Sequence, residues 1–530
     1  MLPAPPGGGP RAAPQATLRG GGGEDGREAP AGNQRSESAI ALTPWCRLLA
    51  IVALSIGGCA RELPGDTPPG KAFYYPVSVT VAPNGLHAYV VSSNFDLHYS
   101  SGWVSVVSLE SLLDGLPIET TVVSEAKVLS LAGGLSLSRS GTMAVTAHRG
   151  AAALSLLEIG DDGKTIGCGV QGDTTDLSYK ERLTDCDRAH MLQTACTAPQ
   201  LEDADRPAGC PWEQDGGRRV FGTSLNDLEL ADPFATAIFE VPAASGGTEP
   251  LLAVSHLTSG DPSVGQTNQL LLFDVESGTT AGESVVLAPR HAVRLGGGGN
   301  LGVAALAVRS DAAGTFLAAA TQKAFTGESQ DPSAVYVVDV TRTLSDQQDR
   351  VSSHSINAEV GGVNLAGITF AANNPDLAFV TNRIPDSVVT LDTSIETVDE
   401  RDSLGTVTVA RRPRFAVLSA QALQPRPAGL LYVTRAAGED LLAVASFADN
   451  VVYLFSVHGS ELRPTGRLPV PGYGPFALAH VARDGSDFLL VTTFFTHALV
   501  VFDVTGDDAA RFRYVTELRS GVPPAGDPAR

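Results

Sequence analysis

A strand–turn–strand pattern that recurs along the chain is the feature that most constrains its fold. In its first copy, "SVTVAPNGLHAYVVS" at Ser78–Ser92, two alternating apolar runs flank Pro83-Asn84-Gly85, and a third run, "WVSVVSL", begins at Trp103. Short alternating runs separated by Gly, Pro and Asn are typical of antiparallel strands. A single unit of this kind leaves one face of its sheet exposed and is marginally stable alone. The recurrence therefore predicts that the units pack against one another.

Six further units follow the first. Their strands are expected in these runs: "LSLS" from Leu135, "MAVTAH" from Met143 and "ALSLLEI" from Ala153; "ATAIFEV" from Ala235, "LLAVSH" from Leu251 and "QLLLFDV" from Gln269; "VAALAVRSDAAGTFLAAAT" from Val303 and "AVYVVDV" from Ala334; "LAGITFAANNPDLAFVTN" from Leu365 and "SVVTLDT" from Ser387; "LLYVTRAAGEDLLAVAS" from Leu430 and "NVVYLFSV" from Asn450; "PFALAHVARDGSDFLLVTTF" from Pro475 and "ALVVFDV" from Ala498. In the sixth unit, "FAVLSAQAL" from Phe415 competes as the first strand.

Seven radial copies bury their faces against one another in a β-propeller. We predict an all-β, seven-bladed β-propeller of four-stranded antiparallel blades over residues 73–520, followed by a tail at 521–530. The 56 glycines, 34 prolines and only 6% aromatic residues favour short strands and turns over helices. The units are spaced more widely than the roughly 40 to 45 residues of common propeller repeats, which implies insertions. The largest, at 160–220, contains cysteines, and we interpret it as a disulfide-stapled excursion from the second blade.

Two of these units resemble a known repeat. "VAPNGLHAYVVSSN…GWVSVVSL" and "ITFAANNPDLAFVTN…SVVTLDT" are similar to YVTN repeats, in which a hairpin is followed by a further strand. The family lies in a clan with YncE-like periplasmic propellers and with lactonase-like propellers related to 6-phosphogluconolactonase. The resemblance covers most of residues 76–520 and implies the propeller fold. It says little about function, because propellers host many chemistries.

The amino-terminal residues indicate export and lipid anchoring. Residues 1–40 are a Gly-, Pro- and Arg-rich extension that we expect to be disordered. At 41–58, Arg47 precedes an apolar run, Leu48–Ile56, which is too short to span a bilayer at about 20 residues and predicts a signal peptide. Translation is expected to begin near Leu42, which would leave the extension untranslated.

The signal run ends in Ile56-Gly57-Gly58-Cys59, which resembles the lipobox of bacterial lipoproteins. The resemblance implies a diacylglycerol on the Cys59 thiol, a tether at 59–72 and, with Ala60 next to the cysteine, the outer membrane as the favoured location. More than one acyl chain holds a protein stably on a membrane. The alternative is an ordinary signal peptide with a buried or disulfide-bonded Cys59.

The remaining cysteines suit an oxidising compartment. Cys168, Cys186, Cys196 and Cys210 lie in one window, and an even number of local cysteines in an exported chain predicts two disulfides. Three pairings stay open. A zinc site is the alternative, but the spacings contain no close pair of cysteines of the CxxC type.

Residues just past each second strand are the candidate site, because these loops share one face of a propeller at the mouth of its channel. They are Asn94, Asp96, His148, Arg149, His256, Gln322, Lys323, Asn382, Arg383, Ser446, Asp449, Phe494 and His497, and the inter-blade links add residues 296–299, Arg412, Arg414 and Tyr473. His148, His256, Arg149 and Arg383 could hold a carboxylate or phosphate. In a lactonase, a histidine would act as base and an arginine would stabilise the oxyanion. The alternative is that these residues close loops.

The net charge and the absence of several catalytic and ligand-binding motifs limit the classes of function that the sequence supports. The net charge of −21 argues against a nucleic-acid partner. There is no GxSxG, HExxH, P-loop or EF-hand motif, and we expect no cofactor and no metal site. We predict a lipid-anchored, non-enzymatic propeller of the cell envelope that binds a protein, peptide or glycan. The competing hypothesis is a lactonase-like or other hydrolase with its site at the channel mouth.

Overall fold

The computed structural model divides into two compact units, Met1–Ala60 and Arg61–Arg530. It describes only part of the second unit: residues 65–149, 153–160, 162–168, 185–186, 191–193, 233–243, 247–256, 269–276, 286–295, 301–323, 334–341, 351–354, 363–401, 407–435 and 438–521. The predictions for the extension, the signal peptide, Cys59, residues 296–299, most of the insertion at 160–220 and the tail after residue 521 lie outside these ranges. No helix of the described residues is long and apolar enough to cross a membrane.

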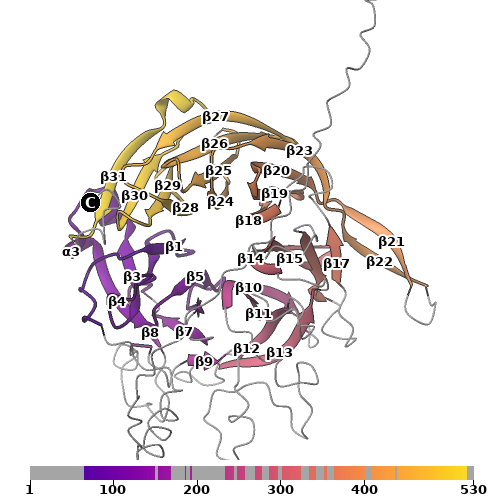
Figure 1. Cartoon of the computed structure of the whole chain (residues 1–530), viewed down its shortest axis with the longest axis horizontal. Coiled ribbons are helices and arrows are strands. Elements are labelled where there is room, and N and C mark those ends of the chain that lie inside the picture. The colour runs from indigo at the N-terminus through magenta and orange to yellow at the C-terminus, as the bar shows by residue number, and fades with distance from the viewer. Residues whose placement is uncertain are drawn as a thin grey trace, which may run out of the picture. The chain divides into compact units, whose positions relative to one another are not determined.

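The second unit is a seven-bladed β-propeller, as the repeats predict (Figure 1). Blade one contains β1 (Pro76–Val81), β2 (His87–Ser92), β3 (Gly102–Ser108) and β4 (Val122–Val128), and blade two contains β5 (Ala132–Leu137), β6 (Met143–His148), β7 (Ala153–Ile159), β8 (Ile166–Cys168) and β9 (Met191–Gln193). Blade three contains β10 (Pro233–Pro242), β11 (Thr248–His256), β12 (Gln269–Glu276) and β13 (Val286–Arg294), and blade four contains β14 (Leu301–Asp311), β15 (Gly314–Lys323), β16 (Val335–Asp339) and β17 (Val351–His354). Blade five contains β18 (Val363–Ala371), β19 (Asn374–Ile384), β20 (Asp386–Asp392) and β23 (Ala416–Ala422), blade six contains β24 (Pro427–Val433), β25 (Leu441–Ser446), β26 (Val451–His458) and β27 (Glu461–Pro469), and blade seven contains β28 (Pro475–Arg483), β29 (Ser486–Thr493), β30 (Ala498–Asp503) and β31 (Arg513–Arg519).

The ring closes by packing rather than by exchange of strands. Each blade comes from one continuous stretch of chain, and the innermost strand of every blade contacts the innermost strands of both neighbours, including β28 against β1. Two short helices of blade one, α2 (Leu109–Leu113) and α3 (Ile118–Thr121), follow β3, and α2 packs against β31 of blade seven. The apolar core therefore lies between adjacent blades, where each sheet covers its neighbour's face.

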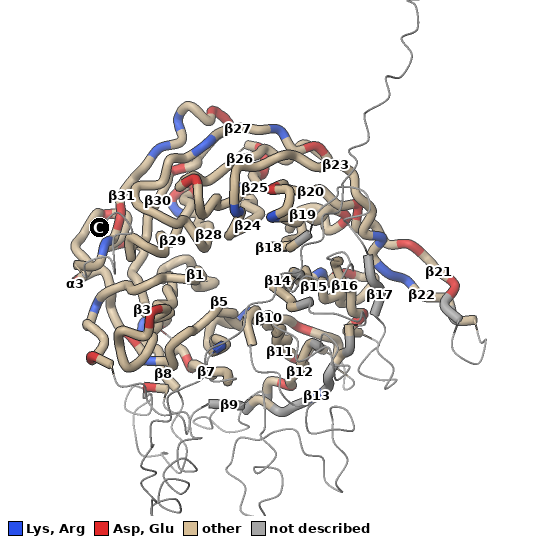
Figure 2. The backbone as a smooth tube through the Cα atoms, viewed as in Figure 1, with Lys and Arg blue, Asp and Glu red and all other residues tan. Residues whose placement is uncertain are grey.

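The structure shows which of the two candidate runs forms the first strand of the sixth blade. The run from Phe415 forms β23, which pairs with β20 as the outer strand of blade five, and the run that contains Leu430 forms β24. A hairpin that the sequence reasoning did not predict, β21 (Ile395–Arg401) and β22 (Val407–Pro413), is inserted between β20 and β23 and carries charges of both signs (Figure 2). Arg412 lies on this hairpin, 3.2 Å from Glu396, so its assignment to an inter-blade link was wrong.

One predicted disulfide staples the insertion of blade two. Cys168 at the end of β8 is bonded to Cys186, and the Cys186 N–H donates to the Lys127 carbonyl on β4 of blade one at 2.9 Å. Asp185 adds an ion pair of 3.2 Å to the Lys127 ammonium. The insertion thus extends from blade two onto the outer strand of blade one. Cys196 and Cys210 lie outside the described residues, so their pairing stays a prediction.

Candidate functional site

One end of the ring gathers the loops that join second to third strands and the links between blades. In blade one, β2 ends and β3 begins at this end, and the chain leaves β4 here for β5 of blade two. The other blades repeat this antiparallel order. We call this end the mouth face. It is the face on which the sequence predicted the candidate residues to converge.

A repeated bulge shapes every blade at the mouth face. The pairing of the first with the second strand shifts register close to the start of the first strand in all seven blades. The second-strand residues opposite the shifted end of the first strand are all polar and buried: Ser92, His148, His256, Thr321, Asn382, Ser446 and Thr493. Bulges are common at the rims of closed sheets, where they re-aim side chains.

Hydroxyl groups of this polar ring close loops within their own blades. The Thr321 hydroxyl donates to the Ala334 carbonyl at 2.9 Å and accepts from its N–H at 2.9 Å. In blade seven, Thr493 makes the same two bonds to Ala498, each of 3.2 Å. These buried side chains satisfy backbone groups that the strands leave unpaired at the loop.

Three predicted ligand-binding residues belong to the same ring. His148 is fully buried, its Nε2 lies 2.7 Å from the Ser155 hydroxyl, and burial lowers the pKa of its ring to about 3. His256 is 3% exposed. Asn382 is fully buried and donates to the Ile384 carbonyl at 3.5 Å. All three side chains are buried, and their binding of a ligand stays a prediction.

The β2–β3 loop of blade one contains two more candidates. Asn94 is fully buried with φ 50°, and its amide donates to the Tyr99 carbonyl at 2.6 Å and to the Ser130 hydroxyl at 2.8 Å. Its side-chain oxygen accepts from the Tyr99 N–H at 3.0 Å. Asn94 therefore anchors the loop, while the next two residues, Phe95 and Asp96, are exposed.

Three exposed aromatic residues lie in loops and links of the mouth face. Phe95 (52% exposed), Tyr473 (68%) and Phe495 (45%) come from the β2–β3 loop, the β27–β28 link and the β29–β30 loop. Phe494 lies 5.5 Å from the Phe95 ring and 5.1 Å from the Phe495 ring, centre to centre. The Phe495 N–H donates to the Tyr473 carbonyl at 3.2 Å. We call Phe95, Tyr473 and Phe495 the aromatic patch.

A second aromatic layer lies behind the patch. The His497 ring is 4.6 Å from the Tyr74 ring and 4.9 Å from the Tyr75 ring, and the Tyr74 hydroxyl donates to the Asp96 carboxylate at 2.7 Å. His497 is fully buried, and burial lowers its pKa to about 4 although the nearby Asp96 acts in the opposite direction. His497 is therefore neutral near pH 7 and supports the patch from behind.

The predicted arginines lie on separate blades. The Arg149 guanidinium is 5.6 Å from the centre of the Phe234 ring, where blade two meets blade three. Arg383, on blade five, donates from Nε to the Pro427 carbonyl of blade six at 3.2 Å, and burial together with the adjacent Arg426 lowers its pKa. The side chain of Lys323 lies outside the described residues.

Sequence reasoning missed Phe95 and Phe495 and named Phe494 and Tyr473 only for their positions. The available signal was composition: "SNFDLHY" and "TTFFTHA" place large apolar rings in loops where polar residues are usual. Within the described residues there is no group of three or more His, Cys, Asp or Glu side chains that could hold a metal ion.

No family model matches the chain, and no curated protein matches its sequence. Its fold is similar to solved propellers. A hydrazine synthase chain of Kuenenia stuttgartiensis is 12% identical, covers 84% of this chain over 99% of its own length and gives a TM-score of 0.47. A putative 6-phosphogluconolactonase of Bacteroides fragilis is 12% identical over 84% of this chain and 94% of its own, with a TM-score of 0.46. Sqt1 of Chaetomium thermophilum, bound to the amino terminus of ribosomal protein L10, is 12% identical over 87% and 90%, with a TM-score of 0.45.

Proposed function

We propose that the chain is a binding protein whose mouth face presents the aromatic patch to a protein, peptide or glycan. The observation that carries the proposal is that the exposed Phe95 and Phe495 rings both pack against Phe494, while the exposed Tyr473 is hydrogen-bonded through its backbone to Phe495. Exposed apolar side chains gathered in one patch cost solvation free energy that a bound partner recovers. Aromatic anchors of this kind dominate the energetics of many interfaces.

The surroundings of His148 favour binding over hydrolysis. His148 and Ser155 form the histidine–serine pair that a nucleophilic mechanism would need, but both side chains are fully buried inside blade two. A catalytic base must come within hydrogen-bond reach of the substrate. In this arrangement both side chains lie in the interior of the blade. A hydrolase stays the competing hypothesis, which the experiment below tests.

Lipid anchoring at Cys59 and a place in the cell envelope, with the outer membrane favoured, complete the proposal. Its support is the signal-like run and lipobox-like motif at Ile56–Cys59. Cys59→Ser is expected to move the protein from the membrane fraction to the soluble periplasmic fraction, because the acyl chains supply the binding energy. Persistence in the membrane fraction would reject the anchor.

The binding function is tested on peptide and glycan arrays with the unit Arg61–Arg530. A double Tyr473→Ala, Phe495→Ala variant is expected to lose at least about tenfold in affinity for whatever the parent binds, which is about 1.4 kcal/mol. Tyr514→Ala is the matched control, because this tyrosine is 46% exposed on β31, the outer strand of blade seven. Lactone turnover that His148→Ala abolishes would overturn the proposal in favour of the hydrolase.

A further inference from the structure

A carboxylate without a counter-charge lies next to the aromatic patch. Asp96 directly follows Phe95 and is exposed. Its Oδ2 accepts from the Tyr74 hydroxyl at 2.7 Å and its Oδ1 from the His98 N–H at 3.2 Å. Within the described part of the chain, no lysine, arginine or histidine side chain is ion-paired with Asp96. Asp96 is therefore an exposed residue whose carboxylate accepts hydrogen bonds from neutral donors.

The corresponding loop of blade six contains a carboxylate that has a cationic partner within the chain. Asp449, in the β25–β26 loop, accepts from the Tyr453 hydroxyl at 2.7 Å and pairs with the Arg467 guanidinium at 2.8 Å. That guanidinium also lies 5.1 Å from the centre of the Tyr453 ring. Carboxylate, aromatic ring and guanidinium thus form one group within the chain. Blade one supplies the carboxylate and the rings and lacks the cation.

The neighbouring basic groups do not fill this place. The ammonium of Lys71 donates to the Glu119 carbonyl on the outer side of blade one. Burial lowers the pKa of His497 to about 4, so the ring carries no charge near pH 7. Arg149 and Arg383 belong to blades two and five and contact other partners. None of these groups therefore supplies a cationic partner to Asp96 in the described part of the chain.

We propose that the aromatic patch and Asp96 together bind an arginine- or lysine-bearing segment of another protein, an inference that rests on the proposed binding function of the mouth face. A cation within about 6 Å of an aromatic ring centre is attracted by the ring's quadrupole. A carboxylate beside the rings adds a charge-assisted hydrogen bond. The chain's net charge of −21 steers basic partners toward it. Arginine suits the site best, because its planar group stacks and hydrogen-bonds at once.

The test compares three end-blocked peptides by isothermal titration calorimetry on the unit Arg61–Arg530. One peptide alternates arginine with leucine, one replaces each arginine by neutral citrulline, and one replaces each arginine by glutamate. The arginine peptide is expected to bind about tenfold more tightly than the citrulline peptide, and the glutamate peptide not to bind. Binding of the arginine peptide should also weaken as salt is raised.

Variants locate the effect. Asp96→Asn is expected to weaken the arginine peptide about tenfold and to leave the citrulline peptide unchanged. Asp449→Asn is the matched control, because this carboxylate already has an arginine partner, and it should leave both peptides unchanged. Tyr473→Ala should weaken both peptides, whereas Tyr514→Ala should weaken neither. Circular dichroism confirms that each variant is folded.

Two outcomes would overturn the inference and separate it from the proposed function. Equal affinity for the arginine and citrulline peptides, or tighter binding of the glutamate peptide, would reject a cationic occupant while sensitivity to Tyr473→Ala would still support the patch as a binding surface. If no peptide binds, a basic segment is rejected. The array experiment with the double aromatic variant then decides the proposed function on its own.

Discussion

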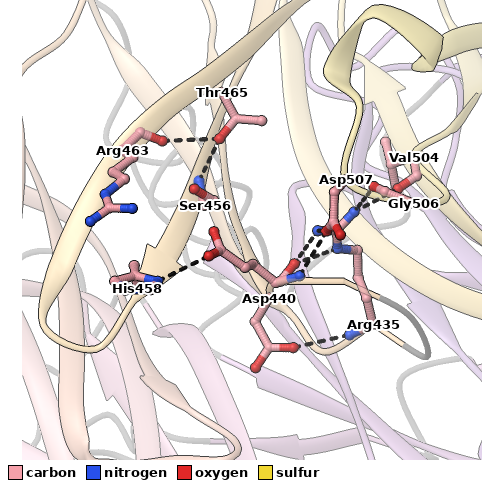
Figure 3. A network of polar contacts seen from close by, with 10 residues as sticks. Arg435, Asp440, Ser456, His458, Arg463, Thr465, Val504, Gly506 and Asp507 are labelled. Atoms are coloured by element: carbon pink, nitrogen blue, oxygen red, sulfur yellow. Dashed lines mark hydrogen bonds and ion pairs between the residues drawn. The ribbon is translucent and has the colours of Figure 1, made fainter.

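Two seams between neighbouring blades are held together in different ways. Between blades six and seven, the Arg435 side chain, 1% exposed, donates to the carbonyls of Glu439, Val504 and Gly506 and pairs with Asp507 at 3.2 Å (Figure 3). Between blades seven and one, where the ring closes, a buried apolar cluster contains Val79 and Ala88 of blade one and Leu490 and Leu499 of blade seven. Both seams bury apolar side chains, and the seam between blades six and seven adds a buried arginine.

The closing seam depends on a segment that precedes the first blade. Phe73 is fully buried in a cluster with Leu109 and Leu112 of α2 and Leu518 of β31. The Ser520 hydroxyl donates to the Phe73 carbonyl at 2.9 Å, which joins residues far apart in the chain. This segment acts as a wedge between the first and last blades, where no chain connection holds the two together.

The arginine seam recurs elsewhere in the ring. Arg309 of blade four donates to the Thr393 carbonyl of blade five and pairs with Asp376 at 3.1 Å. Thr393 follows the end of β20 directly, and Val504 follows the end of β30 in the same way. The two arginines thus reach equivalent carbonyls of the following blade. The same kind of contact therefore occurs at two seams of the ring.

Removing the wedge residue is expected to have the largest effect. Phe73→Ala should lower the free energy of unfolding by about 3 to 5 kcal/mol, because it deletes a fully buried ring and leaves a cavity. Chemical denaturation measures the loss, and hydrogen exchange should rise most at β1 and β28. Phe95→Ala, at a half-exposed ring, is the control with a small effect. A loss below about 1 kcal/mol would contradict the role of the wedge.

Removing the buried arginine between blades six and seven is expected to have the second-largest effect on stability. Arg435→Ala should lower the free energy of unfolding by about 3 kcal/mol, because several carbonyls lose their donor at a buried position. Arg511→Ala, at an arginine 83% exposed and 3.4 Å from Asp508, should change it by less than about 1 kcal/mol. Equal effects of the two variants in urea denaturation would show that the seam does not depend on Arg435.

A methyl group added at the same seam tests how closely the blades approach. A Cβ at Gly429 would meet the Phe476 carbonyl of blade seven inside van der Waals distance. Gly429→Ala is therefore expected to lower the free energy of unfolding by about 1 to 3 kcal/mol through overpacking. Gly459→Ala is a poor match because Gly459 has φ 59°, whereas Gly134→Ala meets open space and serves as the control. An unchanged denaturation midpoint for Gly429→Ala would contradict the tight approach.

Acid is expected to weaken the closing seam by a smaller amount. His497 has its pKa lowered to about 4 in the fold, against an ordinary value near 6.5, so between these values the unfolded chain binds a proton that the folded chain does not. Stability should fall as the pH falls, by up to about 1.4 kcal/mol per pH unit for this residue. His497→Gln should reduce that slope in denaturation curves at pH 7 and pH 5. An unchanged slope for His497→Gln would contradict this assignment.

The repeated strands could be predicted from alternation because each inner strand buries one side chain in two against its neighbour. The burial of the candidate residues at the mouth face could not be predicted in the same way. The bulge opposite His148 lies on β5, and every residue of β6 is buried as far as His148, so alternation gave no sign that this residue at the mouth is buried. The hairpin that contains Arg412 was missed because its strands are largely polar and exposed, which leaves no apolar periodicity to detect.

The hydrogen bond between Ser520 and Phe73 also bears on whether the chain could begin at a different point of the ring. It brings the two ends of the propeller together at one seam, and every blade is encoded by a continuous stretch of sequence. A short linker across that seam, with new termini in the exposed turn at Asp484 and Gly485, would leave every inter-strand pairing intact. The contacts within and between the blades therefore do not require the chain to start at the first blade.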